Sequence, residues 1–248
     1  MLLENKVAIV TGASLGIGRA VAIDYAANGA RVVLAGRKEG PLQEVVALIK
    51  AAGGDAIYVR TDVSVPADCK HLVEATLDHY GRLDIACNNA GILKQPLDTD
   101  LFSIEDWQET VNINLNGMFY CMKYEIPAML AAGGGAIVNM SSVGGKIALP
   151  GLAAYVATKH ANVGLTITAA LEYAERNIRV NAVGPAYIET PLVSTNFPDM
   201  WDILNSSQPI GRIGQPEEVA HLVTFLSSHK ASFATGGYYP IDGGFMAR

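Results

Sequence analysis

The sequence has little cysteine, few basic residues for its size and no long apolar run. Its three cysteines, Cys69, Cys87 and Cys121, form no C-x-x-C pair, so neither a disulfide framework nor a cysteine-ligated metal site is predicted. The five histidines show no ligand spacing, and we expect no metal. Lys and Arg number 18 against 24 Asp and Glu, and the net charge of −6 argues against a nucleic-acid partner.

The amino terminus shows no targeting or anchoring pattern. Its first apolar run ends at Thr11 and Gly12, which is too short for a signal segment or a membrane span. We therefore expect a cytoplasmic protein with small-molecule partners and no membrane contact. The 248 residues are 50% hydrophobic and 17% charged, which suits one α/β domain with a large core, and we predict a single domain over residues 1–248.

Short β-branched runs alternate with longer amphipathic stretches. This alternation predicts a Rossmann-like, doubly wound α/β fold, with a parallel sheet of about seven strands and helices on both faces. Long helical patterns cover residues 103–130 and 154–174, and an irregular region at 187–214 is predicted to be a substrate-binding loop. The expected strands are residues 7–10, 31–35, 56–60, 83–87, 136–140, 178–183 and 237–241.

A glycine-rich segment follows the first expected strand and precedes a helical pattern at residues 20–27. Glycines at such a turn let the backbone approach a pyrophosphate, and the free N–H groups of the new helix favour its negative charge. The alternative is a tight structural turn, but the position after the first strand of a βαβ unit favours a nucleotide. The predicted contacts are Gly12, Ser14, Gly16, Ile17 and Gly18.

Arg37 lies just after the second expected strand, where the turn at residues 35–38 contains no carboxylate. An acidic residue at this place binds the adenosine ribose and marks NAD, whereas an arginine can pair bidentately with the 2′-phosphate of NADP. NADP(H) is therefore favoured. NAD(H) is the alternative, because Arg37 could equally be a solvated surface residue and Glu39 is close to it.

Two further strand ends offer cofactor contacts. Asp62 and Val63 end the third expected strand, where a carboxylate and a backbone group could meet the adenine, although Asp62 could equally be a turn residue before a helix. Residues 88–91 close the fourth strand at the carboxyl edge, where ligands bind in open α/β sheets. Asn and Gly are also ordinary turn residues. The contacts expected from this second turn are Asn89, Ala90 and Gly91.

Tyr155 and Lys159 are four residues apart and would lie side by side on one face of a helix. A nearby ammonium lowers the pKa of a phenol from its ordinary value of ~10, which would make Tyr155 a proton donor at neutral pH. Ser142, 13 residues before Tyr155, adds a small hydroxyl after an expected strand. Taken singly, these residues could be a core tyrosine, a snorkelling lysine and a turn hydroxyl.

In their order along the chain, these motifs resemble the short-chain dehydrogenase/reductase family in its compact single-domain form. The matching segments are TGxxxGxG at 11–18, NNAG at 88–91, Asn114, Ser142, YxxxK at 155–159 and Asp-Gly-Gly at 242–244. The resemblance covers the whole chain. YxxxK alone is weak, since any helix can show it, but the ordered set is specific.

The resemblance implies four catalytic residues, Asn114, Ser142, Tyr155 and Lys159. Tyr155 would act as general acid and Ser142 would hydrogen-bond the carbonyl oxygen. Lys159 would lower the pKa of the tyrosine, and Tyr155 and Lys159 would also contact the cofactor at its nicotinamide ribose. In the family, the residue matching Asn114 lies at a helix irregularity and holds a water on the proton path. Ser141 adjoins Ser142, but the family offset of 13 residues favours Ser142.

The chain departs from the family pattern after the sixth expected strand. Family members usually read Pro-Gly there, whereas this chain reads Gly184, Pro185 and Ala186, and the extra Cβ of Ala186 can alter the backbone over the nicotinamide. Pro185, Ile188 and Thr190 are nevertheless expected to contact the cofactor.

The expected substrate pocket is apolar and aromatic, and it offers no arginine pair for a carboxylate or phosphate. We therefore predict a neutral hydrophobic ketone or secondary alcohol as substrate. The pocket candidates are Ile92, Leu93, Val143, Ile147, Tyr187, Leu192, Phe197, Met200 and Trp201.

The resulting functional prediction is an EC 1.1.1-type oxidoreductase, with carbonyl reduction by NADPH favoured. The alternatives are an NAD-dependent alcohol dehydrogenase and a non-catalytic nucleotide sensor on the same fold. An epimerase or dehydratase of the longer relatives is disfavoured by the glycine spacing. The family resemblance also implies a homotetramer, with interfaces formed by helices 103–130 and 154–174 and by the region of Asp242.

Overall fold

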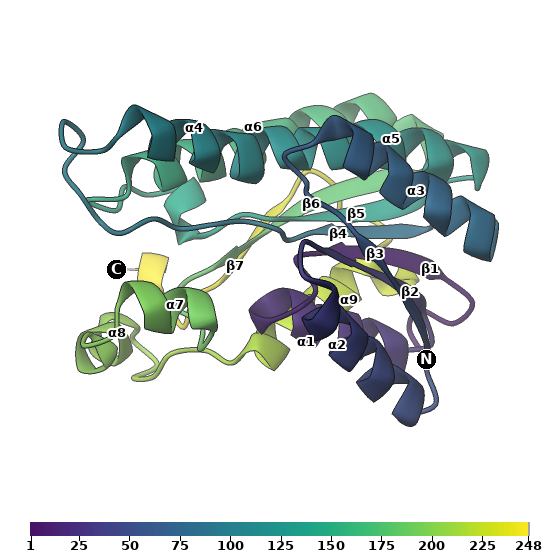
Figure 1. Ribbon diagram of the computed structural model, residues 1–248, viewed down its shortest axis with the longest axis horizontal. Coiled ribbons are helices and arrows are strands. Elements are labelled where there is room, and N and C mark those ends of the chain that lie inside the picture. Colours follow the sequence, from purple (N-terminus) through teal and green to yellow (C-terminus); the bar gives the residue numbers. More distant parts are fainter. Residues whose placement is uncertain (248) are drawn as a thin grey trace.

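A parallel sheet of seven strands lies at the centre of the computed structural model, which describes residues 1–247 (Figure 1). The strand order is β3-β2-β1-β4-β5-β6-β7, which confirms the predicted doubly wound fold. Arg248, the last residue of the predicted domain, lies outside the described residues. The strands are β1 (Val7–Thr11), β2 (Arg31–Gly36), β3 (Asp55–Arg60), β4 (Ile85–Asn88), β5 (Gly135–Met140), β6 (Ile178–Pro185) and β7 (Tyr238–Ile241).

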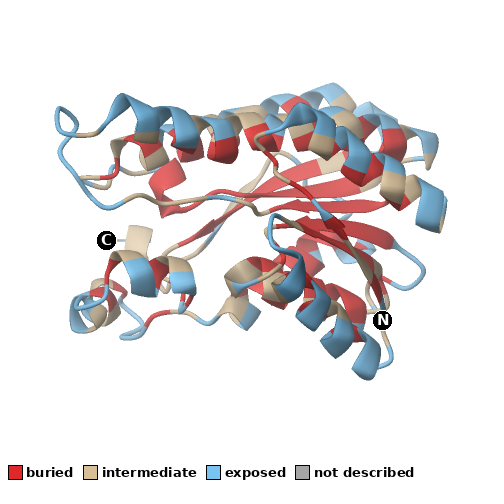
Figure 2. Ribbon diagram, in the orientation of Figure 1, coloured by how far each residue is buried: buried red, intermediate tan, exposed pale blue. Residues whose placement is uncertain are grey.

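Helices cover both faces of this sheet. Those of one layer are α3 (Pro66–Tyr80), α4 (Ile104–Val111), α5 (Gly117–Ala131) and α6 (Ala153–Tyr173), and those of the other are α1 (Gly16–Ala27), α2 (Glu39–Ala51) and α9 (Pro216–Ser227) (Figure 1). The inner strands β1, β2, β4, β5 and β6 are buried on both faces, whereas the edge strands β3 and β7 are only partly buried (Figure 2). This double burial explains why the strands read as near-continuous apolar runs rather than as alternating patterns.

The helix predicted over residues 103–130 is interrupted. A π-helical segment at Asn112–Asn116 separates α4 from α5, and Asn114 is buried within it. Such segments are rare and often lie at functional sites. The irregularity that the family resemblance implied at Asn114 is therefore present in the structure.

Residues 187–214 are more regular than predicted. They contain two short helices, α7 (Pro191–Asn196) and α8 (Trp201–Ser207), and an isolated parallel bridge joins Ile188 to Gly214 at the two ends of the segment. The hydroxyl of Thr190 caps α7 by accepting from the N–H of Val193. The segment therefore forms an ordered lobe beside the C-terminal end of the chain (Figure 1).

The described residues contain neither a candidate membrane-spanning helix nor a candidate metal-binding cluster. None of the helices between residues 1 and 247 is both long and apolar enough to cross a bilayer. In the same range, no group of three or more His, Cys, Asp and Glu side chains could hold a metal ion. The three cysteines are buried and free.

Candidate active site

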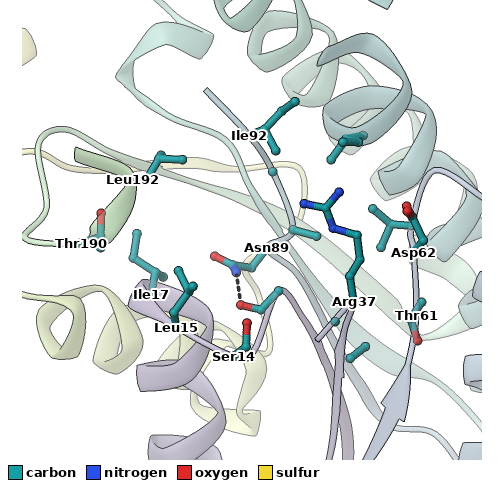
Figure 3. Close-up of a pocket in the computed structure, with 18 residues that line it drawn as sticks. Ser14, Leu15, Ile17, Arg37, Thr61, Asp62, Asn89, Ile92, Thr190 and Leu192 are labelled. Carbon is teal, nitrogen blue, oxygen red and sulfur yellow. Dashed lines mark hydrogen bonds between the residues drawn. The ribbon is translucent and has the colours of Figure 1, made fainter. Parts of the chain in front are cut away.

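The first part of the site is a cavity of about 250 Å³ at the carboxyl ends of β1 and β4. These neighbouring strands lie where the strand order reverses, which is where open α/β sheets bind ligands. Eleven predicted residues line the cavity: Gly12, Ser14, Gly16, Ile17, Arg37, Asp62, Val63, Asn89, Ala90, Gly91 and Thr190 (Figure 3). Sequence reasoning missed Leu15, Ala35, Gly36, Thr61 and Ile113, and it assigned Ile92 and Leu192 to the substrate pocket.

The turn between β1 and α1 is built for an anion. Helix α1 begins at Gly16, and no side chain caps its amino end, so N–H groups of its first turn remain available. Gly12 has a positive φ of 65°, and a Cβ there would lie 2.9 Å from the amide nitrogen of Asn89. This uncapped helix end beside a cavity fits the diphosphate of a dinucleotide cofactor.

Gly18 does not line the cavity, although the sequence predicted a cofactor contact there. A Cβ at this position would lie 2.3 Å from the carbonyl oxygen of Gly12 and 2.5 Å from the Asn89 amide nitrogen. Gly18 therefore allows α1 to pack closely against the glycine turn, which is an indirect contribution to the site.

Thr11 joins the first and fourth strands, and sequence reasoning missed this role. Its hydroxyl accepts hydrogen bonds of 3.0 Å from the backbone N–H groups of Asn89 and Ala90, while the Asn89 side chain donates to the Thr11 carbonyl at 3.0 Å. A threonine at the end of a strand gives only a weak local signal, because these partners are 78 and 79 residues away.

Arg37 and Asp62 lie at the outer end of the cavity. Arg37 is exposed, has no salt bridge within residues 1–247, and extends beside Asp62 into the cavity (Figure 3). One carboxylate oxygen of Asp62 accepts from the backbone and side chain of Ser64 at 3.0 and 2.7 Å. Asp62 is thus a turn residue that also lines the cavity, and the two interpretations of it are compatible.

A second cavity of about 100 Å³ continues from the first toward Tyr155. Ile17, Asn89, Gly91, Thr190 and Leu192 line both cavities, so the two form one continuous site. The predicted residues Ser142, Tyr155, Lys159, Pro185 and Ile188 line the second cavity, together with Met140, Ser141, Ala186 and Val193.

Tyr155 and Lys159 share one face of α6, as predicted from their spacing. The Lys159 ammonium nitrogen lies 5.5 Å from the centre of the Tyr155 ring and donates to the carbonyl oxygen of Met140 at 2.7 Å. Lys159 is only 3% exposed, and burial lowers the pKa of its ammonium to about 8. Its proton can therefore exchange close to neutral pH.

The pKa of Tyr155 differs from the prediction. Burial raises the pKa of the phenol, and the hydrogen bond with Ser142 lowers it by less. The sequence predicted a lowered pKa, because it shows the spacing of the ammonium but not the loss of solvent around the ring. Protonated Tyr155 is thus the stable form in this structure.

The two adjacent serines have different partners. The Ser141 hydroxyl donates to the backbone carbonyl of Lys159 at 3.1 Å and thereby ties β5 to α6. The Ser142 hydroxyl accepts from the N–H of Gly144 at 3.1 Å and donates to the Pro185 carbonyl at 3.5 Å, and Ser142 lines the same cavity as Tyr155. This geometry supports Ser142 as the hydroxyl that faces the reaction.

Asn114 lines neither cavity. Its side chain pairs with the backbone of Ile92, accepting from the N–H at 2.8 Å and donating to the carbonyl at 2.9 Å. Its backbone carbonyl accepts from the side chain of Asn162 at 3.1 Å. Asn114 therefore holds the loop after β4 in place from within the π-helical segment.

An apolar cluster packs against Tyr155. Of the predicted pocket residues, Phe197 is a buried member, and Leu93, Tyr187 and Trp201 pack against it. Val143 and Ile147 do not belong to this cluster, and Met200 is 37% exposed. The members that sequence reasoning missed are Leu149, Leu152, Val156, Val193, Leu204 and Ile213.

Three comparisons with known proteins match nearly the whole chain. A family model described as Enoyl-(Acyl carrier protein) reductase matches residues 12–246. Cyclohexanol dehydrogenase of Acinetobacter sp. (strain SE19) is 46% identical over 245 residues, which cover 99% of this chain and 96% of that protein.

Solved structures agree with this match. A short-chain type dehydrogenase/reductase from Mycobacterium marinum superposes with a TM-score of 0.96 at 36% identity, covering 99% of this chain and 97% of that one. A protein assigned as an NAD(P) dependent gluconate 5-dehydrogenase from Beutenbergia cavernae, with bound NADP at low occupancy, gives a TM-score of 0.94 at 35% identity, with coverages of 99% and 98%.

Proposed function

Because this chain belongs to the short-chain dehydrogenase/reductase family, an oxidoreductase family, we propose that it interconverts a cyclic secondary alcohol and its ketone with a nicotinamide cofactor. The observation that carries the proposal is the meeting of Ser142, Tyr155 and Lys159 at the inner end of the nucleotide cavity. Ser142 and Lys159 are buried and Tyr155 is partly buried, and such surroundings of low dielectric strengthen hydrogen bonds to a developing alkoxide.

The chemistry divides between cofactor and protein. A bound nicotinamide supplies or accepts the hydride. The Ser142 hydroxyl donates a hydrogen bond to the substrate oxygen, while the Tyr155 phenol gives that oxygen its proton in reduction and accepts the proton in oxidation. Lys159 supplies positive charge beside the phenol and exchanges its own proton near pH 8, as its lowered pKa allows. Asn114 positions the loop that borders this end of the cavity.

We favour NADP(H) over NAD(H) for this enzyme. The support is Arg37, an exposed guanidinium at the mouth of the cavity without a carboxylate partner among the described residues. Such a group suits the two negative charges of a 2′-phosphate.

The wall beside Tyr155 supports the proposed substrate class. The cluster of Leu152, Val193, Phe197, Leu204 and Ile213 is entirely apolar. The 46% identical relative is named for cyclohexanol, a neutral cyclic alcohol. We therefore place a neutral alicyclic or aryl ring against this wall, with its oxygen toward Ser142 and Tyr155.

A panel of alcohols and ketones tests this function. The purified protein is assayed with each nicotinamide cofactor against cyclohexanol, cyclohexanone, linear alcohols and sugar acids. The expected result is the highest kcat/KM for the neutral cyclic pair. Turnover of the sugar acids alone, or of nothing in the panel, contradicts the proposal.

A second candidate function is NAD-dependent alcohol dehydrogenase, in which alcohol oxidation is the working direction. The name of the cyclohexanol relative as a dehydrogenase favours it. Measuring kcat/KM for oxidation and reduction with both cofactors separates it from NADPH-dependent reduction.

We also propose that the protein forms a homotetramer. Support comes from apolar side chains exposed on the helices that the family resemblance assigned to an interface, namely Trp107 at 43%, Phe119 at 48% and Leu171 at 79%. Light scattering coupled to size exclusion should give four times the chain mass of 26.2 kDa, and a monomeric mass contradicts this proposal.

A further inference from the structure

Tyr238, at the start of the edge strand β7, contacts the backbone of the catalytic segment. Its hydroxyl donates to the carbonyl oxygen of Ser142 at 2.8 Å, across 96 residues of sequence. The same carbonyl accepts from the N–H of Gly145 at 2.8 Å. Two donors therefore fix the direction of this peptide group, and with it the backbone that carries the Ser142 hydroxyl.

The structure makes room for this contact. Gly184, on the neighbouring strand β6, lies directly under the Tyr238 ring, and a Cβ at Gly184 would come within 2.0 Å of the Tyr238 hydroxyl oxygen. The ammonium of Lys146 lies 5.3 Å from the centre of the same ring. The ring is thus placed by its neighbours rather than free to turn away.

The backbone carbonyl groups on both sides of Ser141 accept hydrogen bonds from residues that are distant in sequence. Lys159 of α6 donates to the carbonyl of Met140 at 2.7 Å, and Tyr238 of β7 donates to that of Ser142. Burial, together with the negative charge of Asp242, raises the pKa of Tyr238, so its phenol keeps the proton that it donates. Segment 140–142 is therefore anchored from the helix layer and from the sheet edge.

We propose that Tyr238 is a positioning residue, which holds the Ser142 hydroxyl in the direction required for catalysis through its hydrogen bond to the Ser142 carbonyl. This inference rests on the proposed function, because it assigns Tyr238 a part in that reaction. Tyr238 itself does not line the cavity in which the reaction is proposed to occur.

The test is a double-mutant cycle with Tyr238→Phe and Ser142→Ala, assayed with a cyclic alcohol. Tyr238→Phe removes the hydroxyl and keeps the ring, so kcat should fall about fivefold with KM for the cofactor unchanged. In the Ser142→Ala background the same change should cost less than about twofold. An equal loss in both backgrounds, or no loss in either, overturns the proposal.

Tyr239→Phe is the matched control. Tyr239 is the next residue along β7, and its ring packs against the core cluster on the other side of the sheet. The kcat of Tyr239→Phe should stay within about twofold of that of the unchanged protein. A loss as large as that of Tyr238→Phe would show a general effect of the strand and would contradict the proposal.

Hydrogen exchange supplies a readout that needs no turnover. The Gly144 N–H donates to the Ser142 hydroxyl oxygen, so it should exchange about fivefold faster in Tyr238→Phe, while amides of β1 keep their rates. Unchanged exchange at Gly144 overturns the proposal. If the protein turns over no alcohol or ketone, the proposed function fails, and the Gly144 amide still decides whether Tyr238 holds this segment.

Discussion

The two ends of the site differ in how they hold charge. The outer end, around Arg37 and Asp62, is open to solvent and relies on backbone groups and an exposed guanidinium. The inner end buries its polar side chains, with Ser142 at 7% and Lys159 at 3% exposure. Water screens charges at the outer end, whereas burial at the inner end shifts pKa values and strengthens each hydrogen bond. We therefore expect modest effects on cofactor choice from the outer end and large effects on turnover from the inner end.

The largest effect should come from Tyr155→Phe at the inner end. Removing the hydroxyl leaves the ring packed against the apolar cluster but deprives the substrate oxygen of its proton partner. We expect kcat to fall by about 10³–10⁴-fold, whereas cofactor affinity should fall by less than about tenfold, as expected for one hydrogen bond to the nicotinamide ribose. Steady-state kinetics and a cofactor fluorescence titration measure the two quantities. If Tyr155→Phe retains a tenth or more of the kcat of the unchanged protein, the inner end does not have the large effect on turnover that we expect.

Ser142→Ala should have the next largest effect. It removes one hydrogen bond to the substrate oxygen, and we expect kcat to fall by about 10²–10³-fold. Ser141→Ala is the matched control, because the Ser141 hydroxyl bonds the Lys159 backbone instead. Equal losses in the two variants would show that the loss reflects damage to the strand end.

The site also shows which features the sequence can predict and which it cannot. Spacing predicted the strand ends, the glycine turn and the shared face of Tyr155 and Lys159, because each depends on residues close in sequence. The pKa direction of Tyr155 was wrong, because burial comes from segments far along the chain. The role of Thr11 was missed for the same reason, since its partners belong to the turn after β4.

Local signals were also overlooked in residues 187–214. Thr190 followed by Pro191 is a typical helix start, with a capping hydroxyl and a proline in the first turn, and α7 begins there. The π-helical segment around Asn114 has no comparable local signal. Its presence could be expected only from the family resemblance.

Glu125 tests whether burial alone shifts a pKa outside the site. It is fully buried on α5, where its carboxylate accepts from the Asn88 amide at 3.0 Å, and burial raises the pKa of its carboxyl from 4.5 to about 7. The folded protein keeps this proton while the unfolded chain loses it, so this group's contribution to stability should fall by about 3 kcal/mol between about pH 4.5 and 7.

Glu125→Gln should remove that dependence. Its free energy of unfolding relative to the unchanged protein should therefore rise with pH through the same window and level off above about pH 7. Urea unfolding at several pH values measures this difference. Glu44→Gln, a change at an exposed glutamate, serves as the control with no such trend. If the difference in free energy of unfolding between Glu125→Gln and the unchanged protein stays constant with pH, the pKa of Glu125 is not raised in the folded protein.

Arg37→Asp should have a smaller effect than Tyr155→Phe or Ser142→Ala, as expected for the exposed end. It replaces a partner of the 2′-phosphate by a like charge, and the ratio of kcat/KM for NADPH over NADH should fall about 10- to 100-fold. The preference of the unchanged protein should weaken as salt is raised. Higher kcat/KM with NADH before any substitution would contradict the NADP(H) proposal.

The pH dependence of alcohol oxidation tests the central claim, that the buried Lys159 ammonium beside Tyr155, with its pKa lowered to about 8, exchanges the proton that passes through the phenol. The account predicts that kcat/KM follows an apparent pKa below the ~10 of an ordinary phenol, and that Lys159→Met raises this apparent pKa by about one unit or more. Lys123→Met, at an exposed position on α5, should leave it unchanged. The same apparent pKa with and without the Lys159 ammonium would contradict the account.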